Sequence, residues 1–182
     1  MTLATYRWTV DRYHKAIDAA VFEAESLELL AGELVVMAPE REAHAYFNDT
    51  VVKYLWRLLG DRAQVRDGKP ITLPNDSEPL PDIAIVQPLD RVYLQHHPYP
   101  ENIYWLIEFS DATLTKDLTV KKEIYAQTGI PEYWVVNLRD RQLHVFRDLQ
   151  NGDYQEQVVL KTGIIQSLAF PAIDLDVQRL LL

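Results

Sequence analysis

Two carboxylates stand beside runs of apolar residues, where a charge is costly. Asp82 follows a proline and opens the run IAIV, and Glu108 is the one charge in YWLIEFS. Burying an unpaired carboxylate is unfavourable by several kcal/mol, so each one needs a cation or a hydrogen-bond donor beside it. Mg²⁺ is one such cation, because it prefers carboxylate oxygens, keeps several waters and takes one or two protein carboxylates. If the two runs are neighbouring strands, Asp82 and Glu108 can share one ion.

A lysine that could join this pair follows in the next predicted helix. Lys121 is four residues after Asp117 and four before Tyr125, so the three side chains share one helix face. The neighbouring Lys122 is the alternative, but it points about 100° away from that face. A metal that activates water, with a lysine beside it, suits phosphodiester hydrolysis. An ordinary ion pair between Asp117 and Lys121 on a helix surface remains open.

The first half of the chain is predicted to alternate between helices and β structure. Apolar spacing predicts a helix over residues 9–22 and another over residues 40–60, which Gly60 ends. Two β-prone runs within residues 26–39 surround a glycine and predict a hairpin. Residues 63–73 favour a strand pair or one bent strand, and a proline-rich loop then leads to the first carboxylate.

The segments with the candidate residues are predicted as central strands and the helix between them. Residues 82–86 and 103–109 are apolar runs of strand length, rich in β-branched and aromatic residues. A helix over residues 116–129 and a strand over residues 132–137 then suggest a crossover unit. Further β-like runs and a short terminal helix follow at residues 141–147, 154–160, 164–170 and 177–182. We expect a mixed α/β (α+β) fold, a central sheet flanked by helices, preceded by a helix and a hairpin.

Length and composition favour one domain that spans residues 1–182. A chain of 182 residues with 48% hydrophobic content can bury a substantial core. There are no cysteines, which excludes disulfides and thiolate zinc sites. The N-terminus lacks the apolar core of a signal peptide, and no apolar run approaches the roughly 20 residues that span a bilayer. We therefore expect a cytoplasmic protein that does not contact a membrane.

The charge of the chain is acidic overall but uneven. The net charge is −9, which counts against a polyanionic partner. Residues 41–69, however, hold six basic and four acidic side chains, whereas residues 76–111 hold seven acidic side chains and one arginine. This pattern is compatible with a metal-collecting region beside a mildly basic rim, in which case nucleic-acid affinity would depend steeply on salt.

Other catalytic templates are missing from the sequence. The glycines and serines form no G-x-S-x-G elbow, no G-x-G-x-x-G motif and no P-loop. The adjacent His96 and His97 lie in a proline-flanked segment without a helical i, i+4 partner, so they do not predict a zinc site. Serine-hydrolase and nucleotide-cofactor chemistry are therefore not expected.

Three stretches of the sequence, taken in order, resemble one known family. They are the PD of Pro81-Asp82, the stretch IEFSDATLTKD and the stretch VKKEIYAQTGIPEYWVVN. This ordered set resembles the Uma-type "putative restriction endonucleases", a branch of the PD-(D/E)XK nuclease superfamily. The resemblance also includes the LELLAGELVVMAP hairpin and the helix of His44, and covers about residues 26–137. It implies a restriction-endonuclease-like fold.

The resemblance also implies roles for individual residues. Asp82 and Glu108 would hold Mg²⁺, with Mn²⁺ as a substitute. In most of the superfamily a lysine stands two residues after the glutamate, but that position is Ser110 here. Families of this kind are thought to supply the lysine from the adjacent helix, which indicates Lys121 as the residue that assists the attacking water. Accessory positions are Glu28, His44, Asp117 and Tyr125.

The leading hypothesis is thus a Mg²⁺-dependent endonuclease that hydrolyses nucleic-acid phosphodiester bonds, with DNA as the expected substrate. A homodimer is expected, because cutting two strands with one site per chain usually requires two copies. Two alternatives remain. One is a non-catalytic interaction or regulatory domain with the nuclease fold, since fold does not determine function. The other is a phosphodiesterase that acts on a small phosphate ester and tolerates the acidic surface.

Overall fold

The fold is built on a six-stranded mixed sheet. The computed structural model describes residues 5–22, 25–37, 39 and 41–181. The strand order is β3-β4-β5-β6-β7-β8, and β5 and β6 are parallel whereas all other neighbours are antiparallel. The strands are β3 (Gln64–Asp67), β4 (Ile83–Val86), β5 (Ile103–Ser110), β6 (Tyr133–Asn137), β7 (Gln142–Gln150) and β8 (Asp153–Leu160). The predicted mixed sheet and the crossover between β5 and β6 are therefore confirmed.

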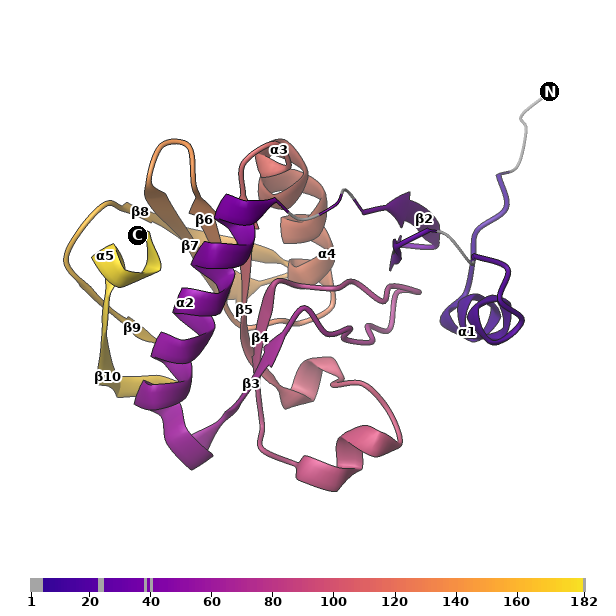
Figure 1. Ribbon diagram of the computed structural model, residues 1–182, viewed down its shortest axis with the longest axis horizontal. Helices are drawn as coiled ribbons and strands as arrows, with labels where there is room; N and C mark the ends of the chain where they lie inside the picture. Colours follow the sequence, from indigo (N-terminus) through magenta and orange to yellow (C-terminus); the bar gives the residue numbers. More distant parts are fainter. Residues whose placement is uncertain (1–4, 23–24, 38, 40, 182) are drawn as a thin grey trace.

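One face of the sheet is covered by the long helix and by the C-terminal segment (Figure 1). The covering elements are α2 (Glu42–Leu59), β9 (Ile164–Ser167), β10 (Phe170–Asp176) and α5 (Val177–Leu180). Leu55 of α2 and Trp105 of β5 are fully buried in this layer. Helix α2 ends where the chain turns at Gly60, whose φ is 53°, a conformation that glycine adopts without steric cost.

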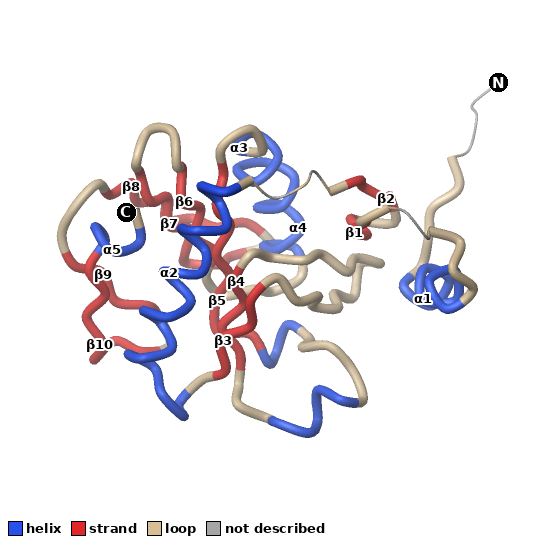
Figure 2. The backbone as a smooth tube through the Cα atoms, in the orientation of Figure 1, coloured by secondary structure: helices blue, strands red, loops and turns tan. Residues whose placement is uncertain are grey.

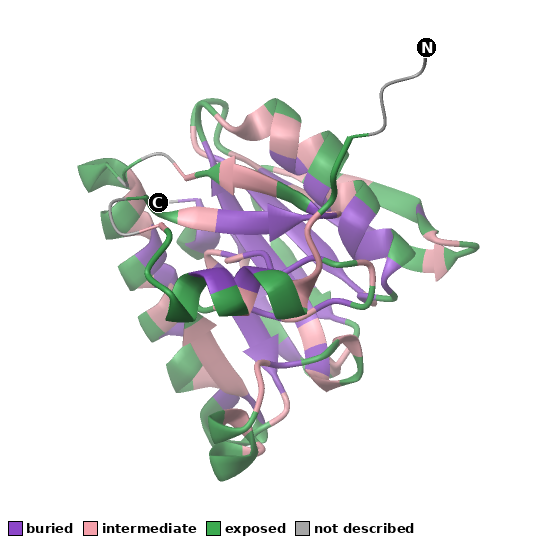
Figure 3. Cartoon of the chain, turned by 90° about the vertical axis from the view of Figure 1, so that its right-hand side faces the viewer, coloured by how far each residue is buried: buried purple, intermediate pink, exposed green. Residues whose placement is uncertain are grey.

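The opposite face is covered by the helical segment that connects β5 to β6. It consists of α3 (Leu114–Lys116), a π-helical turn η4 (Asp117–Lys121) and α4 (Lys122–Gln127). Figure 2 shows the segment beside the strands, and Figure 3 shows that the strands between the two helical layers are largely buried. The sequence predicts one uniform helix over residues 116–129, so the π-helical turn is a correction to that expectation.

The N-terminal helix and hairpin lie beside the sheet (Figure 1). Helix α1 (Val10–Asp18) begins at Thr9, whose side chain accepts a hydrogen bond from the Arg12 backbone N–H. The hairpin consists of β1 (Leu27–Leu30) and β2 (Glu33–Val36), which are antiparallel. The predicted helix and hairpin are confirmed. No helix among the described residues is long and apolar enough to cross a membrane.

The segment after β3 differs from the expected strand pair or bent strand. Strand β3 ends at Asp67, Gly68 has a φ of 54°, and residues 71–73 form no strand of their own. Their hydrogen bonds go instead to the loop: Ile71 N–H donates to the Pro79 carbonyl. Prolines on both sides prevent a continuous ladder, because proline has no N–H to donate. The described residues also form three short 3₁₀ turns, η1 (Gly60–Arg62), η2 (Asp90–Leu94) and η3 (Pro100–Asn102).

The packing of α2 against the sheet predicts very different effects for two adjacent residues. Leu55 is fully buried and Trp56 is 67% exposed. We expect Leu55→Ala to lower the free energy of unfolding by about 2–5 kcal/mol, because it leaves a cavity in the core. Trp56→Ala should change it by no more than about 0.5 kcal/mol, as surface substitutions usually do. Urea unfolding of the two variants measures both values, and equal losses would contradict the assignment of faces.

Candidate active site

Asp82 and Glu108 lie at the same end of the two central strands. Strands β4 and β5 are antiparallel with Ile83 opposite Ile107, so the register continued by one residue sets Asp82 opposite Glu108. Side chains in such cross-strand positions have Cβ atoms about 4.5–5.5 Å apart. The Phe109 backbone N–H donates to Oδ2 of Asp82 at 2.6 Å, which fixes that carboxylate against β5. The predicted neighbouring strands are therefore confirmed, and the sharing of one ion by the two carboxylates stays a prediction.

Glu108 is directed away from the α2 layer because side chains alternate along a strand. Ile107 and Phe109 pack in the α2 layer, whereas Glu108 faces the helical segment behind β5. Its side chain is nearly completely buried, and Oε1 accepts hydrogen bonds from Nζ of Lys121 at 2.8 Å and from the Tyr125 hydroxyl at 2.9 Å. The single charge in the apolar strand thus has two donors.

The π-helical turn explains how one segment supplies three contacts to β5. Asp117, Lys121 and Tyr125 are each four residues apart, a spacing that drifts by about 40° per step in a uniform α-helix. The wider turn between Asp117 and Lys121 offsets this drift, so that Asp117 accepts from the Ser110 hydroxyl at 2.7 Å while the other two contact Glu108. π-Helical turns occur frequently at functional sites. The predicted common face is confirmed.

The two candidate lysines point to different places. Nζ of Lys121 is 2.8 Å from Glu108 and 3.3 Å from Glu28. Nζ of Lys122 is instead 3.1 Å from Asp153 and lies 5.5 Å from the centre of the Phe146 ring. Lys121, and not Lys122, is therefore the lysine beside Glu108 and Glu28.

Glu28 joins the site from the N-terminal hairpin. It is fully buried in β1, and its two oxygens lie 2.9 Å from Nζ of Lys116 and 3.3 Å from Nζ of Lys121. The Leu80 backbone N–H is 3.5 Å from Oε2. Two lysines thus link Glu28 to the segment behind β5. Lys116 was not singled out from the sequence, where it is one of several lysines on a helix.

His44 approaches the site from the first turn of α2. Its Nε2 is 3.1 Å from Oδ2 of Asp82 and 3.1 Å from the Phe109 carbonyl oxygen. Both neighbours are acceptors, so a hydrogen on Nε2 is the tautomer that fits this position. His44 therefore holds one oxygen of Asp82 and leaves the other toward the cleft.

Burial and neighbouring charges shift the pKa values of the central pair. Burial raises the pKa of Glu108 to about 8, opposed by Lys121 and reinforced by the charges of Asp82, Asp117 and Glu28. For Lys121 burial lowers the pKa, but the surrounding carboxylates outweigh it and the net direction is upward. The ammonium is thus protonated at neutral pH, and it acts as a positive charge and a hydrogen-bond donor rather than as a base.

All of the predicted site residues except Tyr125 line a single cleft of about 970 Å³. Oδ1 of Asp82 and Oε2 of Glu108 accept no hydrogen bond among the described residues, and Oδ1 of Asp117 is buried without a partner there. Carboxylate oxygens are the ligands of Mg²⁺ and Mn²⁺. The described residues include no cluster of three or more His, Asp or Glu side chains that could hold a metal. Mg²⁺ requires only one or two carboxylates and completes its shell with waters, so the donor set fits it.

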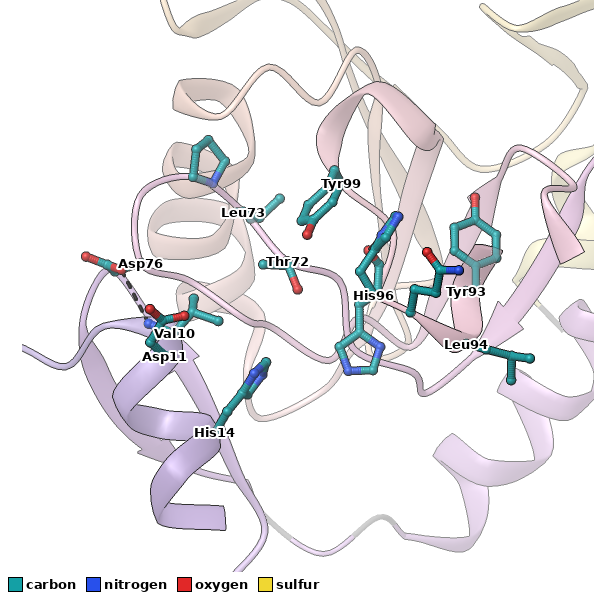
Figure 4. A pocket seen from close by; sticks show the side chains of 13 residues that line it. Val10, Asp11, His14, Thr72, Leu73, Asp76, Tyr93, Leu94, His96 and Tyr99 are labelled. Atoms are coloured by element: carbon teal, nitrogen blue, oxygen red, sulfur yellow. Dashed lines mark hydrogen bonds between the residues drawn. The ribbon is translucent and has the colours of Figure 1, made fainter. Parts of the chain in front are cut away.

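A second cleft of about 580 Å³ lies between α1 and the loops before and after β4 (Figure 4). It is lined by His14, His96 and His97, and none of the predicted catalytic or metal-binding residues borders it. His14 is tied to Glu78, whose carboxylate lies 2.7 Å from Nε2. The phosphate-ester chemistry considered above therefore concerns the larger cleft.

Comparisons with known proteins identify the family of the chain and support its fold. A sequence model of the Uma2 family, described as "Putative restriction endonuclease", matches residues 10–178. The fold is similar to a crystal structure from Anabaena variabilis described as "a putative nuclease belonging to DUF820", with a TM-score of 0.69 and 16% sequence identity, over 86% of this chain and 90% of that chain. At that identity the likeness concerns the fold alone. No curated protein matches the chain significantly.

The raised pKa of Glu108 predicts a stability that depends on pH. A carboxyl with a pKa near 8 in the folded state keeps a proton that the unfolded chain has lost, so the unfolded state binds fewer protons between about pH 5 and 8. Stability should therefore fall with rising pH, by up to about 1.4 kcal/mol per pH unit. Urea unfolding in EDTA measures this slope. Glu108→Gln should reduce the slope, whereas the exposed Glu123→Gln should retain it; a wild-type slope equal to that of Glu108→Gln would refute the shift.

Proposed function

The chain belongs to the Uma2 family, described as "Putative restriction endonuclease", and from this premise we propose that it is a metal-dependent nuclease that hydrolyses phosphodiester bonds of DNA. The observation that carries the proposal is the convergence of Asp82, Glu108 and Lys121 in one cleft, with Asp82 directly before β4 and Glu108 on the adjacent strand β5. Each of the three comes from a different element, so their meeting is a property of the fold and not of local sequence.

Asp82 and Glu108 would hold Mg²⁺ through the oxygens that accept no protein hydrogen bond, and the ion would displace the proton that Glu108 retains below its raised pKa. When bound, the ion lowers the pKa of its water and neutralises the charge that develops on the phosphate. His44 and the Phe109 N–H fix the orientation of the Asp82 carboxylate, and Lys121 and Tyr125 fix that of Glu108. Such partners beyond the metal ligands orient the ligands and contribute to metal affinity.

Lys121 supplies a fixed positive charge at the floor of the cleft. Its ammonium has three donors: Glu108 accepts from one, and Glu28 lies 3.3 Å from the same nitrogen. The third can donate to the attacking water or to a phosphate oxygen, where developing charge is stabilised. Glu28 and Lys116 support Lys121. Glu28 holds the Lys121 ammonium in place, and Lys116 offsets the charge of Glu28.

Cations at the cleft make an acidic protein compatible with a polyanionic substrate. Arg41, Lys116 and Arg139 line the cleft together with the carboxylates. Their contacts with phosphates would make binding weaken steeply with salt. We further propose that the protein acts as a homodimer, since two sites would allow both strands of a duplex to be cut.

Metal binding tests the proposed ligands directly. Asp82→Ala and Glu108→Ala should each abolish calorimetrically detected Mn²⁺ binding at neutral pH, because one carboxylate with waters holds the ion weakly. Asp61→Ala, an exposed acidic residue on η1, serves as the control and should bind like the wild type. Circular dichroism verifies that the variants are folded. Unchanged Mn²⁺ binding in both site variants would overturn the proposal, and binding without cleavage of any nucleic acid would favour a small phosphate ester as substrate.

Cleavage assays test the lysine. We expect Lys121→Met to reduce the cleavage rate of a labelled DNA by about 100-fold or more, the usual effect of losing one donor to a developing charge. The same change also leaves Glu28 and Glu108 without their shared cation, so the free energy of unfolding must be measured in parallel. Lys122→Met, which lies outside the cleft, should cleave at the wild-type rate. A folded Lys121→Met protein with full activity would exclude the assigned role.

A further inference from the structure

Glu28 is held by two lysines whose surroundings differ. The Lys121 side chain is 4% exposed, and its ammonium lies 3.3 Å from Glu28 and 2.8 Å from Glu108. The Lys116 side chain is 30% exposed, lines the larger cleft and donates to Oε1 of Glu28 at 2.9 Å. Of the two lysines beside Glu28, Lys116 is therefore the one that a large ligand in the cleft can contact.

The π-helical turn η4 brings both lysines to the same carboxylate. Lys116 ends α3, and Lys121 ends η4 five residues later. In a uniform α-helix, residues five apart point about 140° away from each other and so face different sides. The i→i+5 hydrogen bonds of a π-helix reduce this angle. The turn that aligns Lys121 with Glu108 thus also brings a second lysine to the cleft.

The Lys116 ammonium has hydrogen-bond donors that the protein does not use. An ammonium carries three N–H groups, and Glu28 is the one acceptor of Lys116 among the described residues. Glu28 in turn has Lys121 as a second cation. Lys116 can therefore bind a further anion while Glu28 stays compensated.

We propose, on the basis of the proposed nuclease function, that Lys116 binds a phosphate of the nucleic-acid substrate and that Glu28 restrains this contact by holding the same ammonium. The anionic groups of a nucleic acid are its phosphates, and lysine binds them as a point charge. Lys121 then acts beside the metal ligands, whereas Lys116 determines substrate affinity. Glu28 is a positioning residue for both lysines: it fixes Lys121, and its negative charge weakens the attraction of Lys116 for phosphate.

Binding measurements test the phosphate contact. The probe is a short fluorescein-labelled DNA, single-stranded or annealed to its complement, and its anisotropy is measured with Ca²⁺ in place of Mg²⁺. Lys116→Gln keeps a hydrogen-bond donor for Glu28 but removes the charge. We expect it to weaken binding and to reduce the slope of log K against log salt by about 1, the effect of losing one phosphate contact.

Two further lysine variants serve as controls. Lys116→Arg retains the charge and should retain most of the affinity. Lys122 is 26% exposed and pairs with Asp153 outside the cleft, so Lys122→Gln should bind DNA like the wild type. Equal losses of affinity in Lys116→Gln and Lys122→Gln would contradict a specific contact.

A double-mutant cycle tests the restraint by Glu28. Glu28→Gln keeps the size of the side chain and removes its charge. We expect it to bind DNA about threefold to fivefold more tightly, the effect of releasing one cation from a partly exposed ion pair. The gain should vanish in Glu28→Gln/Lys116→Gln, which should bind like Lys116→Gln. Cleavage in Mg²⁺ should nevertheless be slower in Glu28→Gln, because Lys121 loses a partner. A merely structural role of Glu28 predicts weaker or unchanged binding.

The negative results are equally specific. Unchanged affinity and salt dependence in a folded Lys116→Gln protein would overturn the phosphate contact. A gain in Glu28→Gln that persists without the Lys116 charge would overturn the restraint, because it would arise from Lys121 or from the charge of the cleft in general. Circular dichroism and Mn²⁺ titration of each variant show whether the fold and the proposed metal ligands are intact.

The outcomes distinguish this proposal from the nuclease function on which it rests. Cleavage of DNA by the wild type together with either negative result would leave the nuclease function standing. The expected changes in affinity without cleavage of any DNA would support the role of Lys116 and contradict the nuclease function. A wild-type protein that neither binds nor cleaves DNA would contradict both.

Discussion

The buried contact between the Lys121 ammonium and the Glu108 carboxyl is the interaction on which the candidate site depends. Both side chains are almost fully buried, and Glu28 is a second buried carboxylate on the same ammonium. Removing one partner of a buried pair is unfavourable by about 3–5 kcal/mol, because the other charge is left uncompensated. Together with Glu28, the pair connects three distant parts of the chain, the hairpin strand β1, the central strand β5 and the turn η4. Any rearrangement of one part must therefore keep the charges of the other two satisfied.

This constraint gives a physical reason for the π-helical turn. Lys121 can reach Glu108 only if the segment behind β5 presents the same face to the strand over two turns, from Asp117 to Tyr125. A uniform α-helix drifts away from that face, and a wider turn restores the alignment. The hydroxyl of Ser110, two residues after Glu108, donates to Asp117 at the start of the turn and so links the turn to β5.

The sequence predicts contacts between residues that are close together in the chain better than contacts between residues that are far apart in it. The apolar run around Glu108 and the helical spacing of Lys121 are local, and they predicted the central strand and the common helix face. The π-helical turn could not be predicted, because its cause is a contact with β5 and not a local preference. The pairing of Asn48 with Asp67 was missed for the same reason: α2 and β3 meet only after folding, and an asparagine in an amphipathic helix carries no pattern of its own. Glu28 came only from the family resemblance, since a single glutamate in a hairpin strand has no spacing signal.

The distribution of charge around the cleft explains how an acidic chain could bind the proposed polyanionic substrate. The carboxylates are collected at the floor, where a divalent cation would convert their repulsion of phosphate into attraction. Arg139 lines the same cleft and forms an exposed ion pair with Asp111, which contributes little stability and could be exchanged for a contact with a substrate phosphate. A net charge of −9 therefore does not oppose nucleic-acid binding in this cleft, because affinity is decided by the few groups that the substrate meets and by the ion it shares with them.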